Sequence, residues 1–172
     1  MPTPRSYLFV PGNRPERFDK ALAAGADAII VDLEDAVGPT DKPAARAALI
    51  RWLDAARPVW IRVNGVDTPW FADDLAALHR PGVAGVIVPK SESAAQVADV
   101  ARALPGTSIM PLIETATGVW RALEIAGAPQ VARLAFGSVD LALDLRAEDG
   151  SETFGYARAR VVFASRVARI DT

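Results

Sequence analysis

The hydrophobic pattern of the chain repeats one unit, a short apolar run followed by a longer segment with helical periodicity. The apolar runs are continuous rather than alternating, which is typical of strands buried on both faces of a parallel sheet. They cover residues 7–10, 28–33, 59–63, 83–88, 109–113 and 134–136. Helices are predicted over residues 13–24, 43–55, 70–79, 94–104, 119–126 and 154–170. The pattern therefore predicts six βα units in succession.

Polar residues at the segment ends support two of these helix boundaries. Asn13 is predicted to cap the first helix, with Pro15 and Glu16 in its first turn. Ser93 and Gln96 have the spacing of a capping pair for the helix over 94–104.

Alternating strands and helices build either a doubly wound sheet or a (β/α)₈ barrel. The VPGNRPE segment after the first strand does not fit the glycine-rich fingerprint of a dinucleotide-binding sheet. Polar residues instead follow nearly every strand, and in a barrel these loops meet at the catalytic face. We therefore expect an α/β fold of the (β/α)₈, or TIM-barrel, family with about six βα units, in one C-terminally short domain over residues 1–172.

Glu114 and Asp140 stand out because each follows one of the last two apolar runs. Carboxylates at the ends of neighbouring parallel strands can face one centre, which suits Mg²⁺ together with waters and substrate oxygens. Two other interpretations are that Glu114 is a charge at a helix N-terminus and that Asp140 is an N-cap. Asp144 competes as a ligand, but Asp140 lies nearer the strand end. Carboxylate sites also accept Mn²⁺.

Charged residues also follow earlier strands. Asp32, Glu34 and Asp35 come after the second run, Arg62 ends the third, and Lys90 follows the fourth. The acidic residues could instead form a solvated turn, and Arg62 could form a structural salt bridge with Asp35 at the end of the barrel.

The composition of the chain excludes several classes of function. The chain has 172 residues, of which 51% are hydrophobic, so a globular domain is expected rather than a disordered one. A net charge of −2 gives no reason to expect nucleic-acid binding. Without cysteine and with only one histidine, His79, thiolate and multi-histidine metal sites are excluded. No apolar run is long enough to span a membrane or to form a signal peptide, so a cytoplasmic location is expected.

Six motifs occur in order along residues 5–169: RSYLFVPGN, ADAIIVDLEDAV, VWIRVNG, GVIVPK, MPLIET and AFGSVDLALDL. With them the chain resembles the citrate lyase beta subunit-like group of the HpcH/HpaI aldolase family, which includes citryl-CoA and malyl-CoA lyases. The resemblance implies a (β/α)₈ barrel that assembles as a homo-oligomer, a trimer or a hexamer.

The resemblance also implies roles for individual residues. Glu114 and Asp140 match the family's Mg²⁺ ligands, and Arg62 matches the arginine that touches substrate oxygen. The acidic cluster matches a group that orders metal-bound water and the arginine; its members are Asp32, Glu34 and Asp35. Three residues near the first loop match the family's coenzyme A contacts: Phe9, Arg14 and Lys20. Phe9 could equally be a core residue, and Lys20 an ordinary surface residue.

These roles imply a Mg²⁺-dependent carbon–carbon lyase that cleaves a 3-hydroxyacyl-CoA, of the citryl-CoA or malyl-CoA type, to acetyl-CoA and an oxo acid. Arg62 would offset charge on oxygen, and a carboxylate or metal-bound water would serve as the base. The alternatives are a malyl-CoA-type thioesterase and a non-catalytic protein that binds a metal and a CoA ester. The chain has six βα units where the family barrel has eight, so we expect a fragment, a naturally short form or a degenerate relative.

Overall fold

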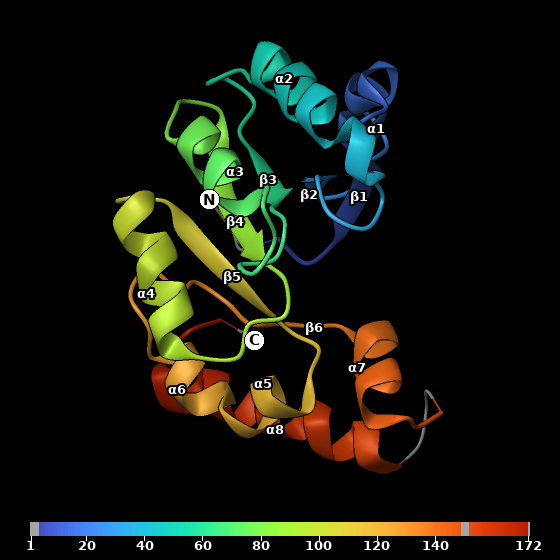
Figure 1. The fold of residues 1–172 in the computed structure, drawn as a ribbon. Helices are drawn as coiled ribbons and strands as arrows, with labels where there is room; N and C mark the ends of the chain where they lie inside the picture. The colour runs from blue at the N-terminus through green and yellow to red at the C-terminus, as the bar shows by residue number, and fades with distance from the viewer. Residues whose placement is uncertain (1–3, 149–151, 172) are drawn as a thin grey trace. The chain divides into compact units, whose positions relative to one another are not determined.

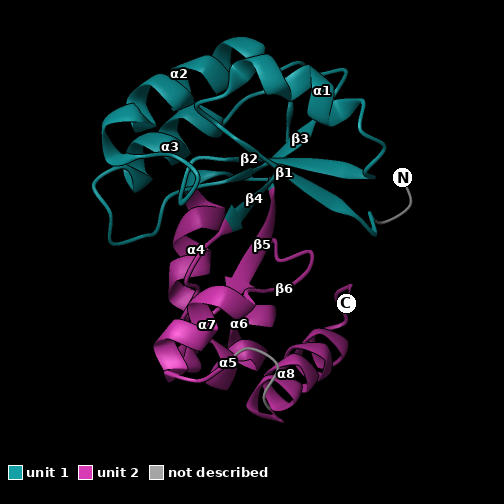
Figure 2. Cartoon of the chain, turned by 90° about the vertical axis from the view of Figure 1, so that its right-hand side faces the viewer, with its two compact units in different colours: residues 1–87, 103–107 teal, residues 88–102, 108–172 magenta. Residues whose placement is uncertain are grey.

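The computed structural model describes residues 4–148 and 152–171, and the chain divides into two compact units (Figures 1 and 2). Unit 1 consists of the described residues within 1–87 and 103–107, and unit 2 of those within 88–102 and 108–172. We describe each unit by itself. The expected single domain over 1–172 stays a prediction.

Unit 1 is built on a parallel sheet in which the strands lie side by side in chain order. The strands are β1 (Tyr7–Pro11), β2 (Ala28–Asp32), β3 (Val59–Arg62) and β4 (Val83–Val88). In this register Asp32, at the end of β2, is the direct partner of Arg62, at the end of β3. Because parallel strands place paired residues side by side, the sheet brings these two side chains to the same edge.

Helices cover the sheet of unit 1 in the same βα order (Figure 2). They are η1 (Pro15–Arg17), α1 (Phe18–Leu22), η2 (Pro39–Asp41), α2 (Lys42–Trp52) and α3 (Phe71–Leu78). Phe18, Leu49 and Leu78 from the helices are fully buried, as is Ile61 from β3. This apolar layer fixes the strand ends that carry the polar residues.

Unit 2 contains the strands β5 (Ser108–Ile113) and β6 (Ala135–Phe136), which pair in parallel. Its helices are α4 (Ala94–Ala103), α5 (Ala116–Trp120), α6 (Ala122–Ala126), α7 (Ser138–Leu145) and α8 (Glu152–Ala168). Helix α8 packs along α6, and the buried core includes Ile113, Ile125, Leu141 and Phe154.

The structure confirms the α/β order of six βα units and the position of each predicted strand within the described residues. The capping pair is also confirmed, since the Ser93 backbone N–H donates to Gln96 and the Gln96 N–H donates to Ser93 Oγ. The Asn13 cap is wrong, because the Asn13 side chain donates to Asp41 Oδ2 instead. Among the described helices, none is both long enough and apolar enough to cross a membrane.

Candidate functional site

Three carboxylates surround Arg62 in unit 1. Arg62 Nε donates to Asp32 Oδ1 at 2.7 Å and Nη2 to Asp32 Oδ2 at 2.6 Å, which is a bidentate pair. Nη1 lies 3.1 Å from Glu34 Oε2 and 3.4 Å from Asp35 Oδ2. The Arg62 side chain is 13% exposed and that of Asp32 is 2% exposed, so this pair is largely removed from water.

Burial by itself would lower the pKa of Arg62, but the hydrogen bonds that Arg62 donates to Asp32 and the charges of Asp32, Glu34 and Asp35 outweigh it and raise that pKa. The guanidinium therefore stays charged at any working pH. The Asp35 side chain remains 60% exposed, so one carboxylate of the cluster still faces solvent. The cluster offers a fixed cation with an accessible carboxylate beside it.

Backbone hydrogen bonds hold the turn that carries these carboxylates. Asp32 accepts the backbone N–H groups of Glu34 and Ala36. The Lys42 ammonium donates to the carbonyls of Leu33 and Glu34 at 2.9 Å each, although Lys42 is only 6% exposed. This buried lysine, for which no sequence motif predicted a role, ties the start of α2 to the turn.

The three predicted coenzyme A contacts differ in their surroundings. Phe9 is 48% exposed, so it is not a core residue, and its ring lies under the Arg62 guanidinium, 5.1 Å from ring centroid to Cζ. Arg14 Nε pairs with Glu16 at 2.6 Å on the surface, and Lys20 is exposed on α1. The structure thus brings Phe9 to the Arg62 cluster, while coenzyme A binding by all three stays a prediction.

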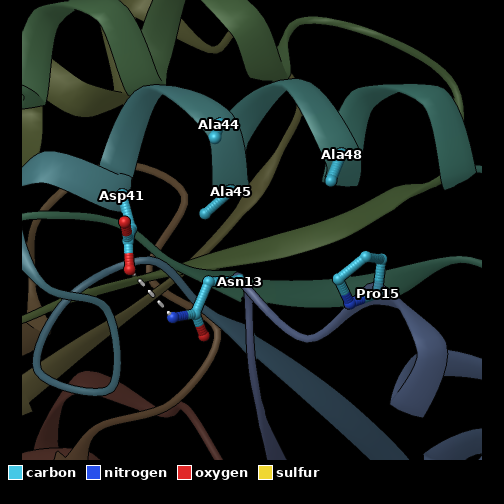
Figure 3. A pocket seen from close by; sticks show the side chains of 6 residues that line it. All are labelled: Asn13, Pro15, Asp41, Ala44, Ala45 and Ala48. Carbon is cyan, nitrogen blue, oxygen red and sulfur yellow. Dashed lines mark hydrogen bonds between the residues drawn. The ribbon is translucent and has the colours of Figure 1, made fainter.

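A pocket of about 370 Å³ lies between the loop after β1 and the first turns of α2 (Figure 3). The small side chains of Ala44, Ala45 and Ala48 leave this space open along α2. Asn13 and Asp41 hydrogen-bond to each other at one end, and Pro15 lines the opposite wall. The pocket is mainly apolar with one polar end, a character common in sites for small organic groups.

In unit 2, Glu114 follows β5 and is 3% exposed. Its Oε1 accepts the backbone N–H of Lys90 at 2.9 Å. Gly137 passes so close to this carboxylate that a Cβ there would lie 2.5 Å from Glu114 Oε2. Thr115, not Glu114, caps α5 by accepting the Gly118 N–H. The side chain of Glu114 is therefore placed by its neighbours rather than by a capping role.

Asp140 lies in the first turn of α7, whose N-cap is Gly137, so the alternative that Asp140 is the N-cap is wrong. Its side chain is 25% exposed, and Oδ2 lies 2.8 Å from Lys90 Nζ. The competing residue, Asp144, accepts the backbone N–H of Ala116 at 2.7 Å. Lys90 thus touches both carboxylates predicted as metal ligands, one through its backbone and one through its ammonium.

This donor set fits a hard divalent cation. Within residues 4–148 and 152–171, no group of three or more His, Cys, Asp or Glu side chains could enclose a metal. Mg²⁺ needs no such cage, because it is commonly held by one or two carboxylates while waters and substrate oxygens complete its octahedron. Because Gly137 has no side chain, the backbone there can lie against the Glu114 carboxylate; a Cβ at this position would collide with it.

The chain is similar along its length to proteins of known family. The family model HpcH/HpaI aldolase/citrate lyase matches residues 5–172. A citrate lyase subunit beta-like protein of Deinococcus radiodurans is 40% identical over 96% of this chain and 63% of its own length. A (3S)-malyl-CoA thioesterase of Cereibacter sphaeroides is 40% identical over 82% of this chain and 51% of its own length. The chain thus spans between about half and two thirds of these relatives.

Solved structures give the same answer for the fold. The CitE protein of Mycobacterium tuberculosis, in complex with magnesium and acetoacetate, matches with a TM-score of 0.86 and 36% identity over 99% of this chain and 73% of its own. A further structure of CitE, with magnesium, acetoacetate and coenzyme A, matches with a TM-score of 0.83 and 37% identity over 95% of this chain and 62% of its own. These matches confirm the predicted TIM-barrel-like fold class. The chain belongs to the HpcH/HpaI aldolase/citrate lyase family.

Proposed function

We propose that the chain carries the metal site and substrate-binding arginine of a Mg²⁺-dependent carbon–carbon lyase that cleaves a 3-hydroxyacyl-CoA to acetyl-CoA and an oxo acid. The observation that carries the proposal is the pair Glu114 and Asp140, joined through Lys90 at the ends of β5 and β6. Structures of the related CitE protein contain magnesium with acetoacetate, and in one case coenzyme A as well. Mn²⁺ is an acceptable substitute at such a site.

Each group has a role in a retro-Claisen cleavage. Bound Mg²⁺ supplies Lewis acidity toward the carboxylate and neighbouring oxygen of the oxo-acid part. Glu114 and Asp140 would hold it. Arg62 would balance negative charge on a substrate oxygen, a task suited to a guanidinium that its carboxylates keep fixed.

A base must remove the proton of the substrate hydroxyl as the carbon–carbon bond breaks and its electron pair passes to the thioester enolate. Asp35 is our first choice because its side chain is 60% exposed, with Glu34 as the second. The enolate then takes up a proton to give acetyl-CoA. Phe9, Arg14 and Lys20 would bind the coenzyme, the two cations through its phosphates.

The test is turnover of malyl-CoA and citryl-CoA with Mg²⁺, followed by separation of acetyl-CoA, oxo acid and free coenzyme A. Glu114→Gln should reduce kcat/KM by a factor of about 100 or more, since a metal ligand and its charge are lost. Glu124→Gln, an exposed glutamate on α6, is the matched control and should retain activity. Full activity of Glu114→Gln would overturn the assignment.

A thioesterase activity is the second candidate, favoured by the 40% identity to the malyl-CoA thioesterase. The product analysis separates the two reactions, because hydrolysis of malyl-CoA releases coenzyme A without an oxo acid. Binding of a CoA ester with no turnover in the presence of Mg²⁺ would instead support a non-catalytic binding protein.

A further inference from the structure

Lys90 connects the two carboxylates of unit 2 in two different ways. Its backbone N–H donates to Glu114 Oε1 at 2.9 Å, and its ammonium pairs with Asp140 Oδ2 at 2.8 Å. Glu114 is 3% exposed, so its negative charge is costly unless a positive group lies close by. One residue therefore satisfies a buried carboxylate through the main chain and brings a cation to its neighbour.

The backbone at Lys90 is held in an uncommon conformation. Its φ is +47°, in the left-handed region that side chains rarely adopt. The next residue fixes this turn, since Ser91 Oγ donates to the Val88 carbonyl at 2.8 Å and Ser91 N–H to the Leu112 carbonyl at 3.2 Å. Non-glycine residues in this region gather at functional sites, where the surrounding structure imposes them.

The side chain of Lys90, unlike its backbone, reaches the solvent. It is 43% exposed, and the lysine ammonium sits on a flexible stem that can turn toward water. A divalent cation at Glu114 and Asp140 would carry twice the charge of the lysine ammonium and would bind the same Asp140 oxygens. The backbone bond to Glu114 can persist after the ammonium leaves.

We propose that Lys90 is the built-in counter-cation of the metal site: its ammonium holds Asp140 while the divalent cation is absent and is displaced when the cation binds. This inference rests on the proposed metal site. Lys90 would keep the two carboxylates together without metal, and would lower the affinity of the site so that the metal exchanges readily.

The test is calorimetric titration of the whole chain with Mn²⁺ and with Mg²⁺. Lys90→Met should bind the cation at least about fivefold more tightly, because the partly exposed ammonium no longer competes with the cation for Asp140. Lys90→Arg should stay closer to the unsubstituted chain because it retains the charge. Arg102→Met, which removes an exposed cation of α4 from its pair with Asp99, should leave the affinity unchanged.

A second measurement needs no substitution. The chain has three lysines, Lys20, Lys42 and Lys90, so the Nζ resonances can be followed separately by NMR while Mg²⁺ is added. The Lys90 signal should shift toward that of a solvated ammonium, and the other two should not move. This readout stays available if Lys90→Met fails to fold.

The outcomes separate the two proposals. Unchanged or weaker metal binding by Lys90→Met, or a Lys90 Nζ signal insensitive to saturating Mg²⁺, would overturn the counter-cation role alone. If the unsubstituted chain binds neither cation, or if Glu114→Gln binds them equally well, the proposed metal site fails first.

Discussion

Arg62 shows how strongly one residue depends on its neighbours. Two of its nitrogens meet both oxygens of Asp32, and the pair is nearly enclosed. Removal of one member of such a pair leaves the other charge buried without compensation, which costs more than the pair itself contributes. The arrangement that holds Arg62 in place therefore also links β2 to β3 in unit 1.

We predict that Arg62→Met lowers the free energy of unfolding by about 3 kcal/mol. The double substitution Asp32→Asn with Arg62→Met should cost clearly less than the sum of the two single changes, because neither charge is then left alone. Urea denaturation of the four proteins completes the cycle. Additive losses would show that the pair contributes no coupling.

Asp27 supplies a pH-dependent contact at the start of the sheet. Its Oδ2 accepts the backbone N–H groups of Arg5 and Ser6 at 2.9 Å each, and these bonds hold its pKa below the ordinary value of 3.8. A carboxylate with a lowered pKa stabilises the fold above its unfolded-state pKa, and the contribution is lost as pH falls through the folded-state value.

Asp27→Asn should therefore lower the melting temperature at pH 7, and the difference from the unsubstituted chain should shrink below pH 3.8. Thermal unfolding at a series of pH values measures this. Asp67→Asn, at an exposed loop position of unit 1, serves as the control and should show no such pH-dependent gap. A gap that stays constant down to pH 2 would contradict the argument.

At the scale of elements, the loop from β2 to α2 depends on Lys42, the first residue of α2. Its ammonium meets two backbone carbonyls and lies 5.0 Å from the centre of the Trp70 ring. Burial lowers the pKa of Lys42, and the charges of Glu34, Asp32 and Asp74 offset part of that effect. The lysine thus joins α2 to the turn that presents the acidic cluster.

Lys42→Met should cost about 2 kcal/mol of stability or more, because two buried carbonyls lose their donor. Hydrogen exchange at Glu34, Ala36 and Val37 should accelerate beyond the global change, since their amides belong to the same turn. Arg51→Met, at an exposed position on α2, should have little effect on either measurement. Unchanged exchange in the turn of Lys42→Met would refute its positioning role.

Strand positions could be predicted because the strands coincide with apolar runs in the sequence, such as 83–88 and 109–113, even though Leu8 and Phe9 of β1 are exposed. Helix α7 was missed for a physical reason. It follows β6 after one glycine, and its apolar residues do not share one buried face: Leu141 is fully buried, whereas Val139 and Leu143 are 72% and 73% exposed. The single helix expected over 119–126 is two short helices that meet at Arg121.

Within the candidate site, the sequence located the acidic residues and the position of Lys90 after a strand, but it indicated neither Lys42 nor the contacts of the two lysines. Glu114, Asp140 and the Asp32 cluster follow strands, and position after a strand is visible in the pattern. Lys42 and Lys90 act on backbone carbonyls, a backbone amide and one carboxylate, which no spacing of residue types reveals. Buried lysine is also rare enough that a polar sequence such as DKPAAR suggests a surface.

At the scale of the whole molecule, the predicted chemistry is divided between the two units. Arg62 and its carboxylates belong to unit 1, and Glu114, Asp140 and Lys90 belong to unit 2. Each group is held by contacts inside its own unit, as the pairs Asp32–Arg62 and Lys90–Asp140 show. A ligand that binds one group should therefore be detectable through the residues of that unit.

Metal binding gives the molecule-wide prediction. A cation that binds only the folded chain stabilises it by about 2.7 kcal/mol at a hundredfold excess over Kd. For a chain of this size the melting temperature should rise by roughly 5–10 °C. The rise should disappear with EDTA and in Glu114→Gln but persist in Glu124→Gln. Hydrogen exchange should slow first at the amide of Lys90, which donates to Glu114, and at that of Gly137, which lies against the same carboxylate. Equal stabilisation of Glu114→Gln would place the cation elsewhere on the molecule.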